Sequence, residues 1–240
     1  MILYLTSSPC VIGADRALLT PQNDFLNHLK LDVLPGVACL YIASNPDDPA
    51  GNQRYSWDMY NAFAEAGILF REMRVLQREN MAEAKALIQW SQLIILAGGH
   101  VPTQNEFFRE LGLRELLRDY SGVVMGISAG SMNCAAETYA QPEMPGETLD
   151  PNYRRFVPGL GLTQLQILPH YQQVKDDILD GKRLYEDITF ADSYGRRFLV
   201  LPDGSYICVR NGISMLHGEA YWLSNGHLRK ICTNGHCVVL

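Results

Sequence analysis

One serine of the chain lies in a sequence pattern that is typical of a nucleophile. Residues 122–131 read Gly-Val-Val-Met-Gly-Ile-Ser-Ala-Gly-Ser, so an apolar run suited to a buried strand ends in Gly-x-Ser-x-Gly around Ser128. In a nucleophile elbow the serine sits on a sharp strand-to-helix turn, and side chains at the two flanking glycines would collide with the neighbouring strand and helix. The amides of a helix begun by residues 131–137 would favour negative charge at the serine. The alternative interpretation is a glycine-rich turn and a serine that caps a helix.

A serine becomes a good nucleophile only beside a base that a third group orients. The chain has six histidines. His170 directly follows the apolar run 165–168, which predicts a short strand, and it is the first candidate for the base. His100, which follows the strand predicted at 93–96, is its rival. The alternative for His170 is an ordinary histidine of a surface loop.

Two glycines, Gly98 and Gly99, follow the strand at 93–96. Glycines at a strand end let backbone amides approach a ligand oxygen closely, so this pair would supply one donor to an oxyanion and the N–H of Ala129 the other. A plain turn at the strand end explains the two glycines equally well.

The elements that must position these residues alternate along the first half of the chain. Apolar runs predict strands at 1–6, 37–43, 70–76, 93–96 and 122–127, and helical stripes lie between most of them. Such alternation is typical of βαβ units and a mostly parallel sheet covered by helices on both faces. Functional residues of such sheets gather at the carboxyl ends of the strands, where Ser128 and Gly99 would lie.

The second half of the chain changes character. We expect a proline-rich loop at 138–159, a polar helix at 173–185 and then a β-rich part. Asp-Gly at 203–204 and Asn-Gly at 211–212, 225–226 and 234–235 are hairpin signals. Nothing resembles a linker, so we expect one α/β domain over residues 1–240.

The composition excludes several classes of function. A net charge of -6 without a basic stripe argues against nucleic acid or an anionic membrane as a partner. No apolar run approaches a membrane span, and the first residues lack the basic region of a signal peptide, so a cytoplasmic location is expected. The six cysteines and six histidines show no ligand spacing, and we predict neither a metal site nor a cofactor.

Three of these motifs together carry a resemblance to a known family. Gly98-Gly99 after a strand, the elbow around Ser128 and Leu-Pro-His-Tyr at 168–171, in this order and spacing, resemble the dipeptidase E and cyanophycinase family of serine peptidases over roughly residues 1–210. The resemblance implies a flavodoxin-like fold akin to class I glutamine amidotransferases. It also implies Ser128 as nucleophile, His170 as base and acid, and the amides of Gly99 and Ala129 as oxyanion donors.

The third member of the implied triad has two candidates. The family places an acid in a turn after the histidine, which matches Asp203, and another acid before Met-Pro, which matches Glu143. Asp203 is preferred because a turn between strands holds a carboxylate more firmly than a proline-rich loop does. An Asp-Gly pair is, however, also what a hairpin turn requires.

The resemblance further implies short peptide substrates, including aspartyl dipeptides. An acidic side chain would require a cation at the pocket wall, and two arginine pairs are available, Arg154-Arg155 and Arg196-Arg197. We prefer Arg196 and Arg197 because they follow the histidine and lead into the candidate acid, and we expect Gly98 to contribute to the same substrate site. The alternative for either pair is a pair of solvated charges on a loop. Met132 stands where aspartyl dipeptidases carry asparagine. The same machinery would also suit an amidase or an esterase, and a non-catalytic relative would only bind a small ligand or a partner protein.

Overall fold

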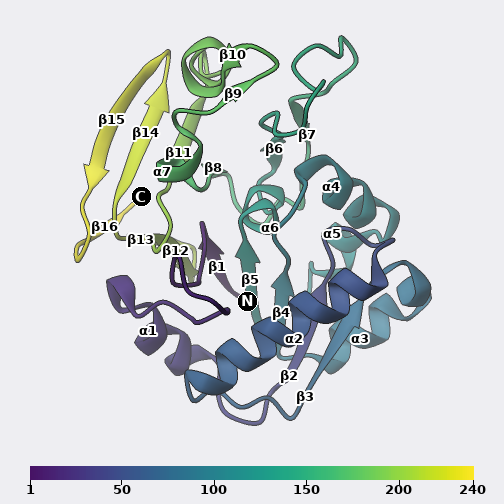
Figure 1. Ribbon diagram of the computed structural model, residues 1–240. Coiled ribbons are helices and arrows are strands. Elements are labelled where there is room, and N and C mark those ends of the chain that lie inside the picture. The colour runs from purple at the N-terminus through teal and green to yellow at the C-terminus, as the bar shows by residue number, and fades with distance from the viewer.

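Five strands pair in parallel at the centre of the molecule. The computed structural model describes all residues 1–240, and Figure 1 shows these strands side by side. Their spatial order is β1 (Ile2–Thr6), β5 (Val123–Ile127), β4 (Leu93–Leu96), β2 (Ala38–Ile42) and β3 (Glu72–Leu76). Beyond β1 the sheet continues through three antiparallel strands, β12 (Tyr206–Arg210), β13 (Ile213–His217) and β16 (Cys237–Val239). The predicted fold class, a mostly parallel α/β sheet with a β-rich C-terminal part, is confirmed.

Helices cover both faces of this sheet because successive strand residues point to opposite sides. Leu40 and Ile42 pack in the core that contains α3 (Ala84–Trp90), α4 (Val101–Glu110) and α5 (Leu113–Leu116). Cys39 and Tyr41 pack on the other face, with α1 (Phe25–Asp32) and α2 (Pro49–Glu65). Figure 1 shows α2 crossing in front of the parallel strands. Short 3₁₀ turns, η1 (Gln22–Asp24) and η2 (Arg78–Glu83), lead into α1 and α3.

A second sheet of four strands lies beside the first. Its spatial order is β15 (His227–Cys232), β14 (Ala220–Ser224), β11 (Arg197–Val200) and β8 (Gln166–Leu168). The strand predicted before His170 is therefore present as β8, and it pairs in parallel with β11 rather than with a strand of the main sheet. The carboxyl ends of β8 and β11 therefore lie next to each other.

The Asp-Gly pair at 203–204 does not close a hairpin, contrary to our expectation. The strand before it, β11, belongs to the second sheet, and the strand after it, β12, pairs with β1 in the main sheet. The turn therefore carries the chain from one sheet to the other. The Asn-Gly pairs at 211–212 and 225–226 do join neighbouring antiparallel strands, and all four of their residues have positive φ, as such tight hairpins require.

The polar helix expected at 173–185 is also absent. A single turn, α7 (Tyr171–Val174), is followed by the hairpin β9 (Ile178–Leu179) and β10 (Lys182–Arg183) and by the π-helix η3 (Leu184–Thr189), which runs into α8 (Phe190–Asp192). Asp180 and Gly181 have φ values of 52° and 79°, which a right-handed helix cannot contain. The Asp180 carboxylate instead accepts the amides of Gly146 and Thr148 and so ties the hairpin to the preceding loop.

The segment predicted as a loop at 138–159 contains a small two-stranded sheet. After α6 (Ala129–Asn133), the strands β6 (Glu137–Tyr139) and β7 (Phe156–Pro158) pair antiparallel, and residues 140–155 form the connection between them. None of the helices of the protein combines the length and the apolar character that crossing a bilayer requires.

Candidate active site

Ser128 occupies a strained turn between β5 and α6. Its φ of 51° and ψ of -112° lie outside the regions that side-chain-bearing residues ordinarily populate. A Cβ at Gly126 would come within 2.7 Å of Ser131 N in α6, and one at Gly130 within 2.3 Å of Leu96 O in β4. The predicted collisions of the flanking positions with a helix and a strand are therefore confirmed.

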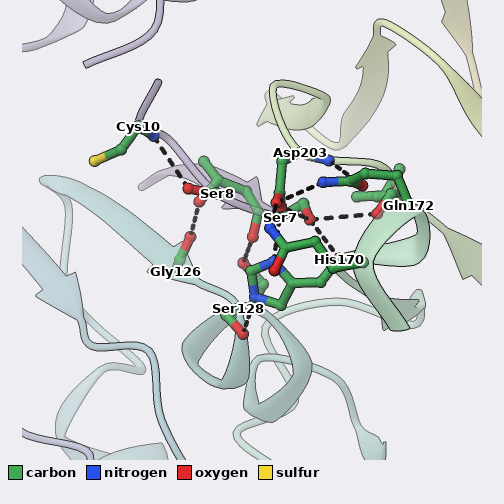
Figure 2. A network of polar contacts seen from close by, with 12 residues as sticks. Ser7, Ser8, Cys10, Gly126, Ser128, His170, Gln172 and Asp203 are labelled. Atoms are coloured by element: carbon green, nitrogen blue, oxygen red, sulfur yellow. Dashed lines mark hydrogen bonds and ion pairs between the residues drawn. The ribbon is translucent and has the colours of Figure 1, made fainter. Parts of the chain in front are cut away.

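The neighbouring strand β1 holds this turn in place. The Ser128 N–H donates hydrogen bonds to the backbone carbonyls of Thr6 and Ser7, and both N···O distances are 3.1 Å. With its amide fixed in this way, Ser128 directs its side chain toward His170, as Figure 2 shows. The distance from Ser128 Oγ to His170 Nε2 is 2.8 Å, which is hydrogen-bond reach.

The parallel pairing of β8 and β11 brings His170 next to Asp203. Leu168 pairs with Val200, and each strand is then followed by a short segment that ends in one of the two polar residues. His170 Nδ1 lies 2.7 Å from Asp203 Oδ1. Because an ionised carboxylate only accepts, Nδ1 carries the proton, which leaves Nε2 free to accept from Ser128.

The Asp203 carboxylate is enclosed and fully hydrogen-bonded. Its side chain is 0% exposed and accepts hydrogen bonds from Ser7 Oγ at 2.6 Å, Gln172 Nε2 at 2.7 Å and Gln173 Nε2 at 2.6 Å, in addition to His170. Burial by itself would raise the pKa of Asp203, but His170 and these donors hold that pKa below its ordinary value. Asp203 is therefore ionised at neutral pH.

Ser7, Gln172 and Gln173 were not among the residues singled out from the sequence. Ser7 follows β1 at the carboxyl edge of the sheet, and the rule that placed Ser128 at this edge applies equally to Ser7. The glutamines follow His170 directly. Gln172 Oε1 also accepts a hydrogen bond from the backbone N–H of Asp203 at 2.9 Å. The side-chain amide of Gln172 therefore both donates to Asp203 and accepts from it.

The amides expected to bind an oxyanion lie beside Ser128 without other partners. Neither the Gly99 N–H nor the Ala129 N–H donates a hydrogen bond within the protein. Ala129 is the first residue of α6, where a helix has no internal acceptor to offer. Gly99 has a φ of 152°, and a Cβ there would come within 2.4 Å of Ser44 Oγ. Gly98 adjoins the serine, since its own Cβ would lie 3.5 Å from Ser128 Cβ.

Ser128 and His170 open into a cavity of about 180 Å³. The loop between β6 and β7 contributes Gln141, Pro142 and Glu143 to its wall. Ligand pockets for drug-sized molecules occupy roughly 300–1,000 Å³, so this cavity suits a smaller group, such as one amino-acid residue. No three His, Cys, Asp or Glu side chains of the protein form a group that could hold a metal ion.

Glu143 and His100, the alternatives considered from the sequence, do not take part in the hydrogen bonds from Ser128 to Asp203, although Glu143 lines the cavity. Glu143 Oε1 accepts the Val101 N–H at 3.3 Å, and no hydrogen bond joins Glu143 to His170. His100 Nε2 lies 2.7 Å from Glu147 Oε1 rather than beside Ser128. The geometry therefore favours Asp203 and His170.

Arg196 and Arg197 do not lie at the pocket wall, contrary to our expectation. Arg196 forms an ion pair with Glu137 and stacks over Phe156, and the Arg197 guanidinium lies 4.1 Å from the centre of the Trp222 ring. Arg197 begins β11 and Arg196 directly precedes this strand, whereas Asp203 follows its end. The length of the strand separates them from the cavity, and no lysine or arginine lines it.

Known peptidases are similar to this chain in sequence pattern or in fold. The sequence profile of peptidase family S51 matches residues 41–215, which is more than half of the chain. The chain belongs to peptidase family S51. The matched segment of this S51 member contains Ser128, His170 and Asp203, whereas Ser7 lies before it. A search of curated proteins finds no match.

Two solved structures share the fold of this S51 peptidase. A peptidase from an acI-B1 actinobacterium is 18% identical, with a TM-score of 0.69 and coverage of 100% of this chain and 96% of that one. A protein from Listeria monocytogenes EGD-e, named as a candidate peptidase E, is 17% identical, with a TM-score of 0.60 and coverage of 90% and 96%. At these identities the likeness shows the common fold.

Proposed function

We propose that the protein is a serine peptidase that hydrolyses short peptides, with Ser128 as nucleophile, His170 as general base and acid, and Asp203 as the residue that orients the imidazole. The observation that carries this proposal is the chain of hydrogen bonds from Ser128 through His170 to the enclosed Asp203 at the wall of a small cavity. Membership in a peptidase family supports the hydrolysis of peptides in particular.

The reaction begins when Ser128 Oγ attacks the scissile carbonyl carbon while His170 Nε2 takes its proton. The carbonyl oxygen becomes an oxyanion, which accepts hydrogen bonds from the N–H groups of Gly99 and Ala129. The imidazolium ion gives its proton to the leaving nitrogen, the C–N bond breaks, and an acyl-enzyme remains on Ser128. A water molecule then repeats the sequence, losing a proton to His170, and the acid product leaves with the serine hydroxyl restored.

A fluorophosphonate probe tests the nucleophile directly. We expect the probe to label the wild-type protein and the Ser121→Ala control, which lacks an exposed serine far from the cavity, and not to label Ser128→Ala. Peptide mapping must place the adduct on Ser128. Absence of labelling in the wild type would favour a binding protein over an enzyme.

A panel of dipeptides then identifies the substrate. We expect release of free amino acids from some members by the wild-type protein and from none by Ser128→Ala. Hydrolysis of esters or simple amides alone, with every dipeptide intact, would contradict peptidase function. The cytoplasmic location and the absence of nucleic-acid and membrane partners stay predictions from the sequence.

A further inference from the structure

The ionisable groups that line the cavity, apart from His170, are both acidic. Glu143 lies on the loop between β6 and β7, and Asp177 lies on the segment that follows α7. Neither carboxylate forms an ion pair, although most other acidic side chains near the site are engaged: Glu147 with His100, and Asp203 with His170. The protein therefore supplies no ion-pair partner to these two carboxylates, and both residues remain exposed to solvent at the cavity.

The structure holds Glu143 in position rather than leaving it on a free loop. Glu147 Oε2 accepts the backbone N–H of Glu143 at 2.8 Å and that of Met144 at 3.0 Å, while its other oxygen meets His100. Glu143 Oε1 accepts the Val101 N–H. Val101 is two residues beyond Gly99, whose amide would bind the substrate carbonyl. The hydrogen bond from Val101 therefore holds the Glu143 carboxylate at a residue close in the chain to Gly99.

The environment of Glu143 disfavours its charge. Although the residue keeps contact with solvent, partial desolvation is the main cause that raises the pKa of the Glu143 carboxyl group. The neighbouring Glu147 also raises this pKa, while His100, His170 and the Val101 amide lower it. A bound cation would relieve this penalty, because an opposite charge within a few ångströms favours the ionised carboxylate.

Asp177 lies on another part of the wall and is also fixed through its backbone. Its N–H donates to Val174 O at 3.1 Å, and its carbonyl accepts the Leu184 N–H at 2.9 Å. Val174 and Leu184 line the cavity with Asp177 and add apolar surface to its wall. A group that enters between Glu143 and Asp177 thus meets an apolar surface and two carboxylates.

We propose that this cavity selects peptides whose acyl residue carries a protonated amine, which Glu143 and Asp177 bind while Ser128 attacks the adjacent carbonyl. The inference rests on the proposed peptidase function and reverses the acidic preference expected from the sequence. The amine belongs either to a free peptide N-terminus or to a lysine side chain. Both are ammonium ions and present the same charge and N–H donors to the carboxylates.

Matched dipeptides with leucine as the leaving residue separate these two sources. N-acetyl-norleucyl-leucine is the neutral reference. Norleucyl-leucine adds only the free N-terminal amine, and N-acetyl-lysyl-leucine adds only the side-chain amine. We expect at least one of the two to exceed the reference by about tenfold or more in kcat/KM, the effect of a charge-assisted hydrogen bond. N-acetyl-aspartyl-leucine should be cleaved more slowly than its asparaginyl counterpart.

Variants assign the preference to the two carboxylates. Glu143→Gln and Asp177→Asn should each reduce the ratio of cationic to neutral substrate, and the double variant should bring it close to one. Glu186→Gln and Asp176→Asn remove exposed carboxylates that do not line the cavity, and both should keep the wild-type ratio. Equal rates on all matched peptides, a faster aspartyl peptide, or a preference that survives in the double variant would overturn the proposal.

Binding to Ser128→Ala distinguishes failure of this inference from failure of the proposed function. Calorimetry with the same uncleaved peptides should show tighter binding of the cationic one by about tenfold, and the Glu143→Gln/Asp177→Asn changes should remove the difference. Tighter cation binding in a protein whose wild type neither cleaves peptides nor reacts with a fluorophosphonate would overturn the peptidase assignment alone. Probe labelling of Ser128 with no charge preference in rate or binding would overturn the inference alone.

Discussion

Ser7 Oγ donates a hydrogen bond of 2.6 Å to Asp203 Oδ1, across 196 positions of the chain. The same hydroxyl oxygen accepts the backbone N–H of His170 at 2.7 Å, and the Ser7 carbonyl accepts the N–H of Ser128 at 3.1 Å. One residue at the end of β1 therefore contacts the three residues of the proposed triad, as Figure 2 shows for its side chain.

Ser7→Ala tests whether these contacts position the triad. The change leaves the backbone N–H of His170 without its acceptor and removes one donor from Asp203. We expect kcat to fall on the order of 10–100-fold with KM nearly unchanged, because small misplacement of reacting groups has effects of this size. Ser8→Ala is the control, since the Ser8 hydroxyl accepts only the N–H of Cys10 at 3.2 Å. A change in stability without a change in kcat would limit Ser7 to a structural role.

Substitutions of Ser128 should separate activity from stability. Ser128→Ala removes the nucleophile and should lower kcat by about a thousandfold or more, with little change in thermal stability. Ser128→Gly also removes it but releases the strained backbone, so it should raise the free energy of unfolding by about 1–3 kcal/mol. Chemical denaturation of the three proteins measures the difference. Retained turnover in either variant would contradict the assignment of the nucleophile.

Asp203→Asn and Glu143→Gln compare the two candidate acids in one assay. The amide at position 203 would favour the wrong imidazole tautomer, and the corresponding change in trypsin costs on the order of 10⁴ in kcat. Glu143→Gln should instead alter the choice of substrate and leave most of the kcat for neutral peptides. If the Glu143 change proves the more damaging to kcat, the proposed triad is wrong.

The stability of the protein should depend on pH through Asp203. Burial opposes ionisation of Asp203, but hydrogen bonds from His170, Ser7 and Gln172 hold its pKa below the ordinary 3.8. A carboxylate with a lower pKa in the folded than in the unfolded chain contributes stability above the unfolded-state value, and this contribution is lost as the pH falls through the folded-state pKa.

Asp203→Asn should therefore lower the free energy of unfolding at pH 7 by about 1.5–3 kcal/mol, the range for hydrogen bonds to charged groups. The difference from the wild type should shrink as the pH falls below 3.8. Urea denaturation at several pH values between 7 and 3 measures it. A difference that stays constant over this range would indicate lost packing rather than lost charge.

Local properties of the sequence were sufficient to predict the elbow and the α/β class. The apolar runs that form β1, β2, β4 and β5 are buried strands because their composition suits a sheet covered on both faces. The glycines around Ser128 are required by contacts that any strand-to-helix turn of this kind makes. These features depend on residues near one another in the chain, so a pattern in the sequence is enough to indicate them.

The tertiary structure alone decided which distant segments meet. The Asp-Gly signal at 203–204 indicated a tight turn but not the partners of the flanking strands, which belong to different sheets. The pairing of β8 with β11 brings His170 to Asp203 and leaves Arg196 at the far end of the strand. Ser7 and the two carboxylates of the cavity likewise reach the site through contacts between segments far apart in the sequence. Strand pairing and the charge of a cavity depend on such long-range contacts, which the local periodicity and turn residues of the sequence do not encode.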